Sequence, residues 1–177
     1  MAAAGGIRMT IAYRTANSDD GAQLHELFTR VFCDTFAHLY RAEDLDAFLA
    51  GFSVEGWQVQ LRDPAFSFRL AESGGKAIGF AKVGPLALPI EADEGSVMLY
   101  QLYVDGTFHG AGIGNVLMDW VVEEARRRDA PALYLTVFTD NRRARRFYER
   151  YGFEPAGRYE FMVGSQADED VIMKKAL

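Results

Sequence analysis

The sequence predicts an α+β fold with a mixed, mostly antiparallel central sheet flanked by helices. Runs rich in β-branched and aromatic residues are separated by segments whose apolar residues recur every three or four positions. These runs follow the order strand, helices, three strands, helix, strand, helix and two strands. This order lacks the regular strand–helix alternation of a doubly wound sheet.

The first part of the chain predicts one strand followed by helices. Residues 17–20 offer Asn, Ser and Asp side chains that can cap a helix start. The helix that follows places Leu24, Leu27 and Phe28 on one face, and Asp63-Pro64 ends the last helix of this part. The predicted elements are a strand at 7–15, a helix from about 18 to 36, and short helices at 44–48 and 54–61.

The rest of the chain predicts a sheet interrupted by two helices. The segment Ser73-Gly74-Gly75-Lys76 is typical of a hairpin turn, and it joins two strand-like runs. Two prolines and an acidic cluster predict a loop at 85–94. The predicted elements are strands at 66–72, 77–83, 96–104 and 133–138, helices at 113–128 and 141–150, and a final strand pair, 159–163 and 171–173, around a polar loop.

Length and composition limit the class of protein. A chain of 177 residues with 49% hydrophobic residues predicts a single domain over 1–177, with a flexible N-terminus at 1–6. The net charge of -6 argues against a nucleic-acid partner, because phosphate binding needs a concentrated basic surface. No signal peptide and no run of about 20 apolar residues occurs, so we expect a cytoplasmic protein without a membrane partner.

One cysteine, Cys33, excludes an intramolecular disulfide and is interpreted as a small buried apolar residue. Cys and His residues do not have metal-ligand spacing, so no metal site is expected. A homodimer is compatible with the sequence.

The most informative segment runs from Val104 through His109 to Gly114. An apolar strand ends there in alternating glycines, Gly110, Gly112 and Gly114, and a strongly periodic helix follows at once. Backbone N–H groups at such a helix start can approach a pyrophosphate closely. A dinucleotide fingerprint would need a glycine where Asn115 stands, and a P-loop would need Gly-Lys-Ser/Thr, so neither pattern fits.

The segment Leu102-Tyr103-Val104, followed by His109-Gly110-Ala111-Gly112-Ile113-Gly114, resembles the acyl-CoA signature of the GNAT superfamily of N-acetyltransferases. That signature is Gln/Arg-x-x-Gly-x-Gly/Ala, and His109 here replaces the usual Gln or Arg. The resemblance implies acetyl-CoA as co-substrate, bound largely by main-chain groups. It also implies that the strand before the glycines splays from the strand at 133–138. The cofactor residues implied are Leu102, Tyr103, Val104, His109, Gly110, Ala111, Gly112, Ile113, Gly114, Asn115, Asn141, Phe147 and Tyr148.

A second segment, residues 141–153, resembles the superfamily's Asn-x-x-Ala-x-x-Phe-Tyr-x-x-x-Gly-Phe. The resemblance implies that Tyr148 returns a proton to the leaving thiolate and that Asn141 bonds the pantetheine arm. The alternatives are that Phe147 and Tyr148 belong to the buried stripe of a helix and that Asn141 is an N-cap. The arginines at 142, 143, 145 and 146 are most simply a solvated helix face, of which one or two could neutralise the 3′-phosphate.

The segment from Phe32 to Tyr40 resembles the front end of bacterial polyamine acetyltransferases, which implies that Phe36, His38 and Tyr40 contact an amine. Alternatively, Asp34, Glu43 and Asp44 simply face water. The strand at 96–104 carries no carboxylate to serve as a general base. Either a nearby residue such as Glu94, Glu72 or His38 recruits water, or the amine loses its proton to solvent.

We expect an acetyl-CoA-dependent N-acetyltransferase in which a primary amine, of a polyamine or another small molecule, attacks the thioester directly. One alternative is an acetyltransferase of protein N-terminal or lysine amines. The other is a CoA-binding sensor without catalysis.

Overall fold

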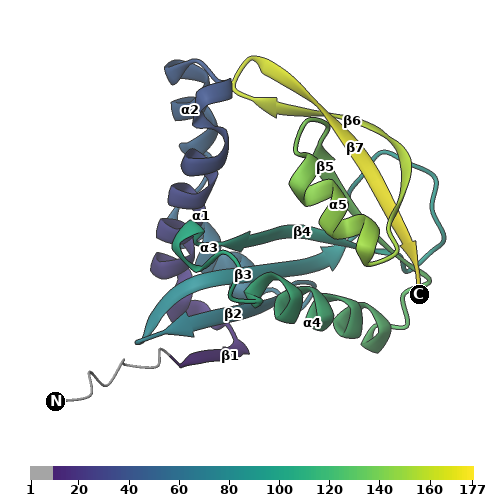
Figure 1. Ribbon diagram of the computed structural model, residues 1–177, viewed down its shortest axis with the longest axis horizontal. Helices are drawn as coiled ribbons and strands as arrows, with labels where there is room; N and C mark the ends of the chain where they lie inside the picture. The colour runs from purple at the N-terminus through teal and green to yellow at the C-terminus, as the bar shows by residue number, and fades with distance from the viewer. Residues whose placement is uncertain (1–9) are drawn as a thin grey trace, which may run out of the picture.

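The computed structural model describes residues 10–177, and their strands form a single seven-stranded sheet in the order β1-β2-β3-β4-β5-β7-β6 (Figure 1). Only the β4–β5 neighbours are parallel, which confirms the predicted mixed, mostly antiparallel sheet. The strands are β1 (Ile11–Thr15), β2 (Ser67–Ser73), β3 (Lys76–Pro85), β4 (Val97–Val104), β5 (Ala132–Phe138), β6 (Glu154–Val163) and β7 (Gln166–Ala176).

Helices cover the sheet in two groups, each with its own apolar cluster (Figure 1). The N-terminal group buries an aromatic cluster around Phe28, Trp57 and Phe80, whereas the helix after the glycines packs through Leu117 and Met118. The helices are α1 (Gly21–Phe36), α2 (Ala42–Leu49), α3 (Val54–Arg62), α4 (Ile113–Arg127) and α5 (Arg142–Arg150), with short 3₁₀ turns η1 (Ser18–Asp20), η2 (Ala37–Leu39) and η3 (Gly106–Phe108).

Strands β4 and β5 diverge along most of their length. They pair only at Val97–Leu133 and Met98–Tyr134, although β4 stays paired with β3 up to Val104. The edge of β4 beyond Met98 therefore has no β5 partner. This confirms the splay that the family resemblance implied.

The final hairpin is longer than the sequence predicts. Residues interpreted as a polar loop belong to β7, which pairs with β5 on one side and β6 on the other. The turn is only Gly164 and Ser165, with Gly164 at φ +58° in the left-handed region. Pairing with β6 holds the polar residues 166–169 extended, and β5 joins on the other side from Asp170 onward, so the local sequence pattern underestimates the length of β7. The predicted start of the first strand at 7–9 and the flexible residues 1–6 lie outside the described residues.

The turn of this hairpin is fastened to α2. Oδ1 of Asp44 accepts hydrogen bonds from N (2.7 Å) and Oγ (2.8 Å) of Ser165, while Oδ2 accepts one from Nε of Arg41. A Cβ at Gly164 would lie 2.5 Å from Cα of Asp44. Asp44 is thus buried as a structural anchor, and the expectation that it faces water is wrong.

Candidate active site

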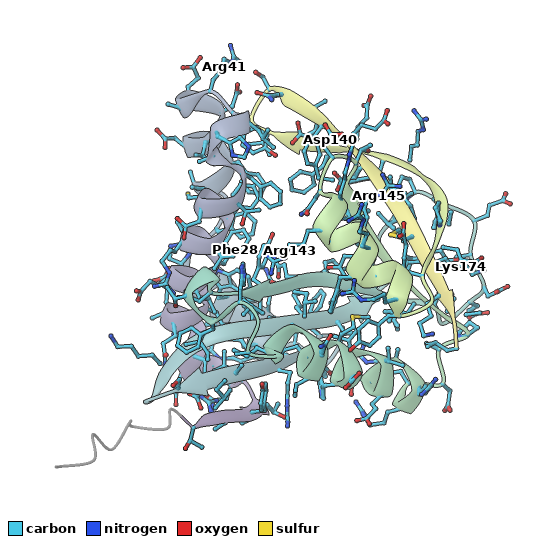
Figure 2. The ribbon with its side chains drawn as sticks, viewed as in Figure 1. Phe28, Arg41, Asp140, Arg143, Arg145 and Lys174 are labelled. Atoms are coloured by element: carbon cyan, nitrogen blue, oxygen red, sulfur yellow. The ribbon has the colours of Figure 1, made fainter. Side chains whose placement is uncertain are left out.

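A cavity of about 850 Å³ opens where β4 and β5 diverge. Its walls come from α1, the β4 edge, the glycine turn, β5, the inner side of α5 and β7 (Figure 2). Segments far apart in sequence therefore meet around one space. Two ends can be distinguished, named after the roles that the family resemblance implies: an acetyl-donor end at the glycine turn, called the donor end, and an amine-acceptor end between α1 and β7, called the acceptor end.

The glycine turn presents unpaired N–H groups to the donor end. Gly110 (φ +86°) and Gly112 (φ +78°) adopt left-handed conformations, and Gly112 is the N-cap of α4. The first i→i−4 bond there runs from N of Val116 to O of Gly112, so Ile113, Gly114 and Asn115 have no intrahelical acceptor. A Cβ at Gly110 or Gly112 would meet nothing within 4 Å, so backbone conformation, not packing, requires glycine. An anion fits this open, positively polarised helix start.

His109 is held between the main chain and α5. Its Nε2 lies 3.2 Å from O of Val104, and its Nδ1 lies 3.0 Å from Nη1 of Arg143 (Figure 2 labels Arg143). A carbonyl only accepts and a guanidinium only donates, so this geometry assigns the proton to Nε2. Arg143 thus brings a positive charge to the turn. The sequence predicted that one or two of these arginines could meet a phosphate, but not which ones.

Helix α5 places an aromatic pair at the cleft. Tyr148 packs against Phe147 (ring centroids 5.4 Å apart) and Phe153 (5.8 Å) while also lining the cavity. Burial raises the pKa of Tyr148 to about 12, so the phenol keeps its proton at neutral pH. Asn141 also lines the cavity, but its Oδ1 accepts a hydrogen bond from N of Ala144, so it is an N-cap as well.

The acceptor end is formed by tyrosines and aspartates. The phenol of Tyr40 donates a hydrogen bond to Asp168 of β7, and Asp170 lies two residues further on the same strand face. Burial raises the pKa of Asp170 to about 6, with Asp168 adding to the rise and a hydrogen bond from Thr136 opposing it. Burial also raises the pKa of Tyr103, with smaller contributions from Tyr148 and Asp170. All three side chains line the cavity.

Most residues expected at the site line the cavity. This holds for Leu102, Tyr103, Val104, His109, Gly110, Gly112, Ile113, Gly114, Asn115, Asn141, Phe147, Tyr148, Phe36 and Tyr40. Ala111 and His38 are exposed and do not line it.

None of the three residues named as bases from the sequence lies in the cleft. Glu72 pairs with Arg14, and Glu94 and His38 are exposed outside the cavity lining. Cys33 is half-buried, which differs from the expected burial, and does not line the cavity. Within residues 10–177, no three His, Cys, Asp or Glu side chains are grouped to hold a metal ion. Over the same residues, every helix is too short or too polar to cross a membrane.

Sequence comparison identifies the family. The model of the acetyltransferase (GNAT) family matches residues 22–153, so the chain belongs to this family of N-acetyltransferases, with acetyl-CoA as co-substrate. An uncharacterized N-acetyltransferase of Mycobacterium bovis is 32% identical over 117 residues, which cover 66% of this chain and 71% of that protein. A spermine/spermidine N(1)-acetyltransferase of Bacillus subtilis is 32% identical over 92 residues, which cover 49% of this chain and 59% of that protein.

Structure comparison agrees on the fold. The PaiA N-acetyltransferase of Thermoplasma acidophilum, solved in complex with coenzyme A, superposes with a TM-score of 0.76 at 20% identity, covering 96% of this chain and 100% of that one.

Proposed function

We propose that this acetyltransferase transfers the acetyl group directly to a primary amine of a small cationic molecule of polyamine type. One observation carries the proposal. A single cavity between the splayed strands joins an unpaired β4 edge and a helix start to a buried phenol and two carboxylates. The first group suits the donor, and the second suits a protonated acceptor.

The donor end supplies binding through main-chain groups. The N–H groups at the start of α4, together with the guanidinium of Arg143, face the position that a pyrophosphate would take. The free edge of β4 at Leu102–Val104 can pair with the amides of the pantetheine arm in the manner of an added strand. An N–H of the same edge can polarise the thioester carbonyl.

The chemistry proposed for the chain's side chains is proton transfer. Tyr148 keeps its proton at neutral pH and lines the cavity, so it can protonate the leaving thiolate. Cys33 lies outside the cavity lining, which favours direct attack over a covalent enzyme intermediate.

The acceptor end favours a cation with an alkyl chain. Phe32, Phe36 and Phe161 provide apolar walls, and Asp168 and Asp170 provide negative charge. This combination suits the methylenes and ammonium groups of a polyamine. The similarity to the Bacillus subtilis spermine/spermidine acetyltransferase supports the same acceptor class.

Two measurements test the function. Calorimetry with acetyl-CoA should show binding, and an assay of thiol release should show amine-dependent turnover with spermidine ahead of aminoglycosides, amino acids and peptides. No binding heat would refute the donor site. Binding without thiol release from any amine would favour a CoA sensor, and turnover with peptides alone would favour a protein acetyltransferase.

A further inference from the structure

Asp170 occupies a distinctive place at the acceptor end. It lies on β7, in register with Phe138 of β5 and Tyr159 of β6, and it is only 6% exposed. It nevertheless lines the cavity that holds Tyr148. A carboxylate so well shielded from bulk water, with an opening onto an active-site cavity, can exchange a proton with a bound molecule.

The groups around Asp170 come from four directions. Asp168 precedes it on the same strand face, Tyr40 follows the η2 turn, Tyr103 comes from β4, and Thr136 of β5 hydrogen-bonds its side chain. The pKa values of Tyr40 and Tyr103 are raised, first by burial and then in part by neighbouring acidic groups that include Asp170. Both phenols are neutral at physiological pH, and Asp168 is the one carboxyl group among these four neighbours.

We propose that Asp170 is the general base that deprotonates the acceptor ammonium, an inference that rests on the proposed amine acetylation. Three placements support it. Asp170 faces the same cavity as Tyr148, Tyr103 of the strand edge assigned to the thioester lines this cavity too, and β4 carries no carboxylate that could act instead. Asp168, held by the phenol of Tyr40, lies beside it as a positioning residue that attracts the cation.

The proton balance of the step is complete. The ammonium carries three N–H protons, and the amide product keeps one. One proton moves to the Asp170 carboxylate, and the freed lone pair forms the bond to the thioester carbonyl carbon. The C–S bond then breaks with its electron pair on sulfur, which takes the Tyr148 proton. The second nitrogen proton returns to the Tyr148 phenolate, and Asp170 releases its own to solvent.

The pH dependence of kcat/KM for spermidine tests this assignment. For the unmodified enzyme, kcat/KM should fall as the pH drops below about 6, the pKa of the Asp170 carboxyl. This fall is the acid limb of the profile. Asp170→Asn should lose that limb and reduce kcat/KM at pH 7 by about 10²–10⁴-fold, while calorimetry shows acetyl-CoA binding unchanged. A steep rise of the residual rate with pH should remain, because only amine deprotonated in solution can then react.

Two neighbouring substitutions should move the limb in opposite directions. Thr136→Val removes a hydrogen bond that lowers the pKa of Asp170, so the limb should move to higher pH. Asp168→Asn removes a like charge that raises this pKa, so the limb should move to lower pH. A merely structural role of Asp170 would produce neither displacement.

Glu169→Gln is the matched control, since Glu169 is exposed on the same strand and pairs with Arg158. It should leave the profile unchanged. If Asp170→Asn keeps both the limb and the rate, or if the two neighbouring substitutions leave the limb in place, Asp170 is not the base, although amine acetylation stands. If the unmodified protein releases no thiol with any amine, the proposed function fails and this inference fails with it.

Discussion

Arg143 at the start of α5 donates to Nδ1 of His109 in the glycine turn, at 3.0 Å. The pair joins the second motif segment to the first. His109 stands at the position where the family signature has Gln or Arg, and the guanidinium that reaches this position comes from another helix. We expect these two side chains together to take the part of the one long side chain in the family signature.

Arg143→Ala should weaken acetyl-CoA binding by about tenfold. This loss is near the lower end of what a hydrogen bond to a charged group contributes, and we expect the lower end because Arg143 is exposed. Calorimetry measures the effect directly. Arg142→Ala is the control, since Arg142 is also exposed but does not line the cavity. Equal losses from both substitutions would indicate a diffuse effect of charge.

Gly112→Ala should lower both stability and acetyl-CoA affinity. The added Cβ meets no atom of the protein within 4 Å, but φ of +78° costs an L-residue about 1–2 kcal/mol. Gly74→Ala is the control, because Gly74 has φ +57° and equally open surroundings in the β2–β3 turn. Urea unfolding should show similar losses for both proteins, and calorimetry should show weaker binding only for Gly112→Ala. Unaltered binding there would contradict the pyrophosphate assignment.

Tyr148→Phe should reduce kcat by about 10²–10⁴-fold and leave the Kd for acetyl-CoA nearly unchanged, since only the proton donor is lost. Steady-state kinetics and calorimetry together separate the two quantities. Because the pKa of Tyr148 is about 12, its ionisation should cause no fall in kcat as the pH rises to 10. Tyr151→Phe is the control, because the Tyr151 phenol bonds Asp119 and lies outside the cavity lining. Full turnover by Tyr148→Phe would remove this residue from the mechanism.

Glu124 of α4 predicts an acid-sensitive contribution to stability. Burial alone would raise its pKa, but hydrogen bonds from Arg127, Ser67 and Arg128 outweigh burial and bring the pKa to about 2. The unfolded chain, with an ordinary glutamate pKa of about 4.3, therefore binds more protons between these values. The contribution is present above about pH 4.3 and is lost as the pH falls toward 2.

Glu124→Gln should reduce the free energy of unfolding at pH 7 by about 1–2 kcal/mol. This value is smaller than the pKa shift alone implies, because solvent screens the exposed Arg127 partner. The loss should be smaller at pH 3. Urea unfolding at the two pH values gives both quantities. Glu123→Gln, an exposed neighbour, should show neither effect. A deficit that is constant with pH would contradict the ionic origin.

The sequence alone was sufficient to predict those elements whose local residue pattern agrees with the fold. Strand β4, the glycine turn and α4 are recognisable because an apolar run, left-handed glycines and a periodic helix follow one another directly. Asp170 was not identified because residues 166–170 are mostly polar, without strand-like alternation. They form a strand only by pairing with β6, which β5 joins at Asp170. Arg143 was named but not singled out, because nothing in a run of arginines indicates which one meets His109. Both depend on contacts between segments distant in sequence.

The attachment of the β6–β7 turn to α2 brings together two segments that lie far apart in the sequence. In the proposed function, the groups assigned to the thioester lie on β4, the glycine turn, α4 and α5. Tyr40 and Asp168 at the acceptor end come instead from segments nearer the two ends of the chain, which the hydrogen bonds between Asp44 and Ser165 hold together. We therefore expect substitutions in these two segments to alter which amine is accepted without disturbing the groups that bind the thioester. On this proposal, the substrate range can change while the glycine turn stays the same.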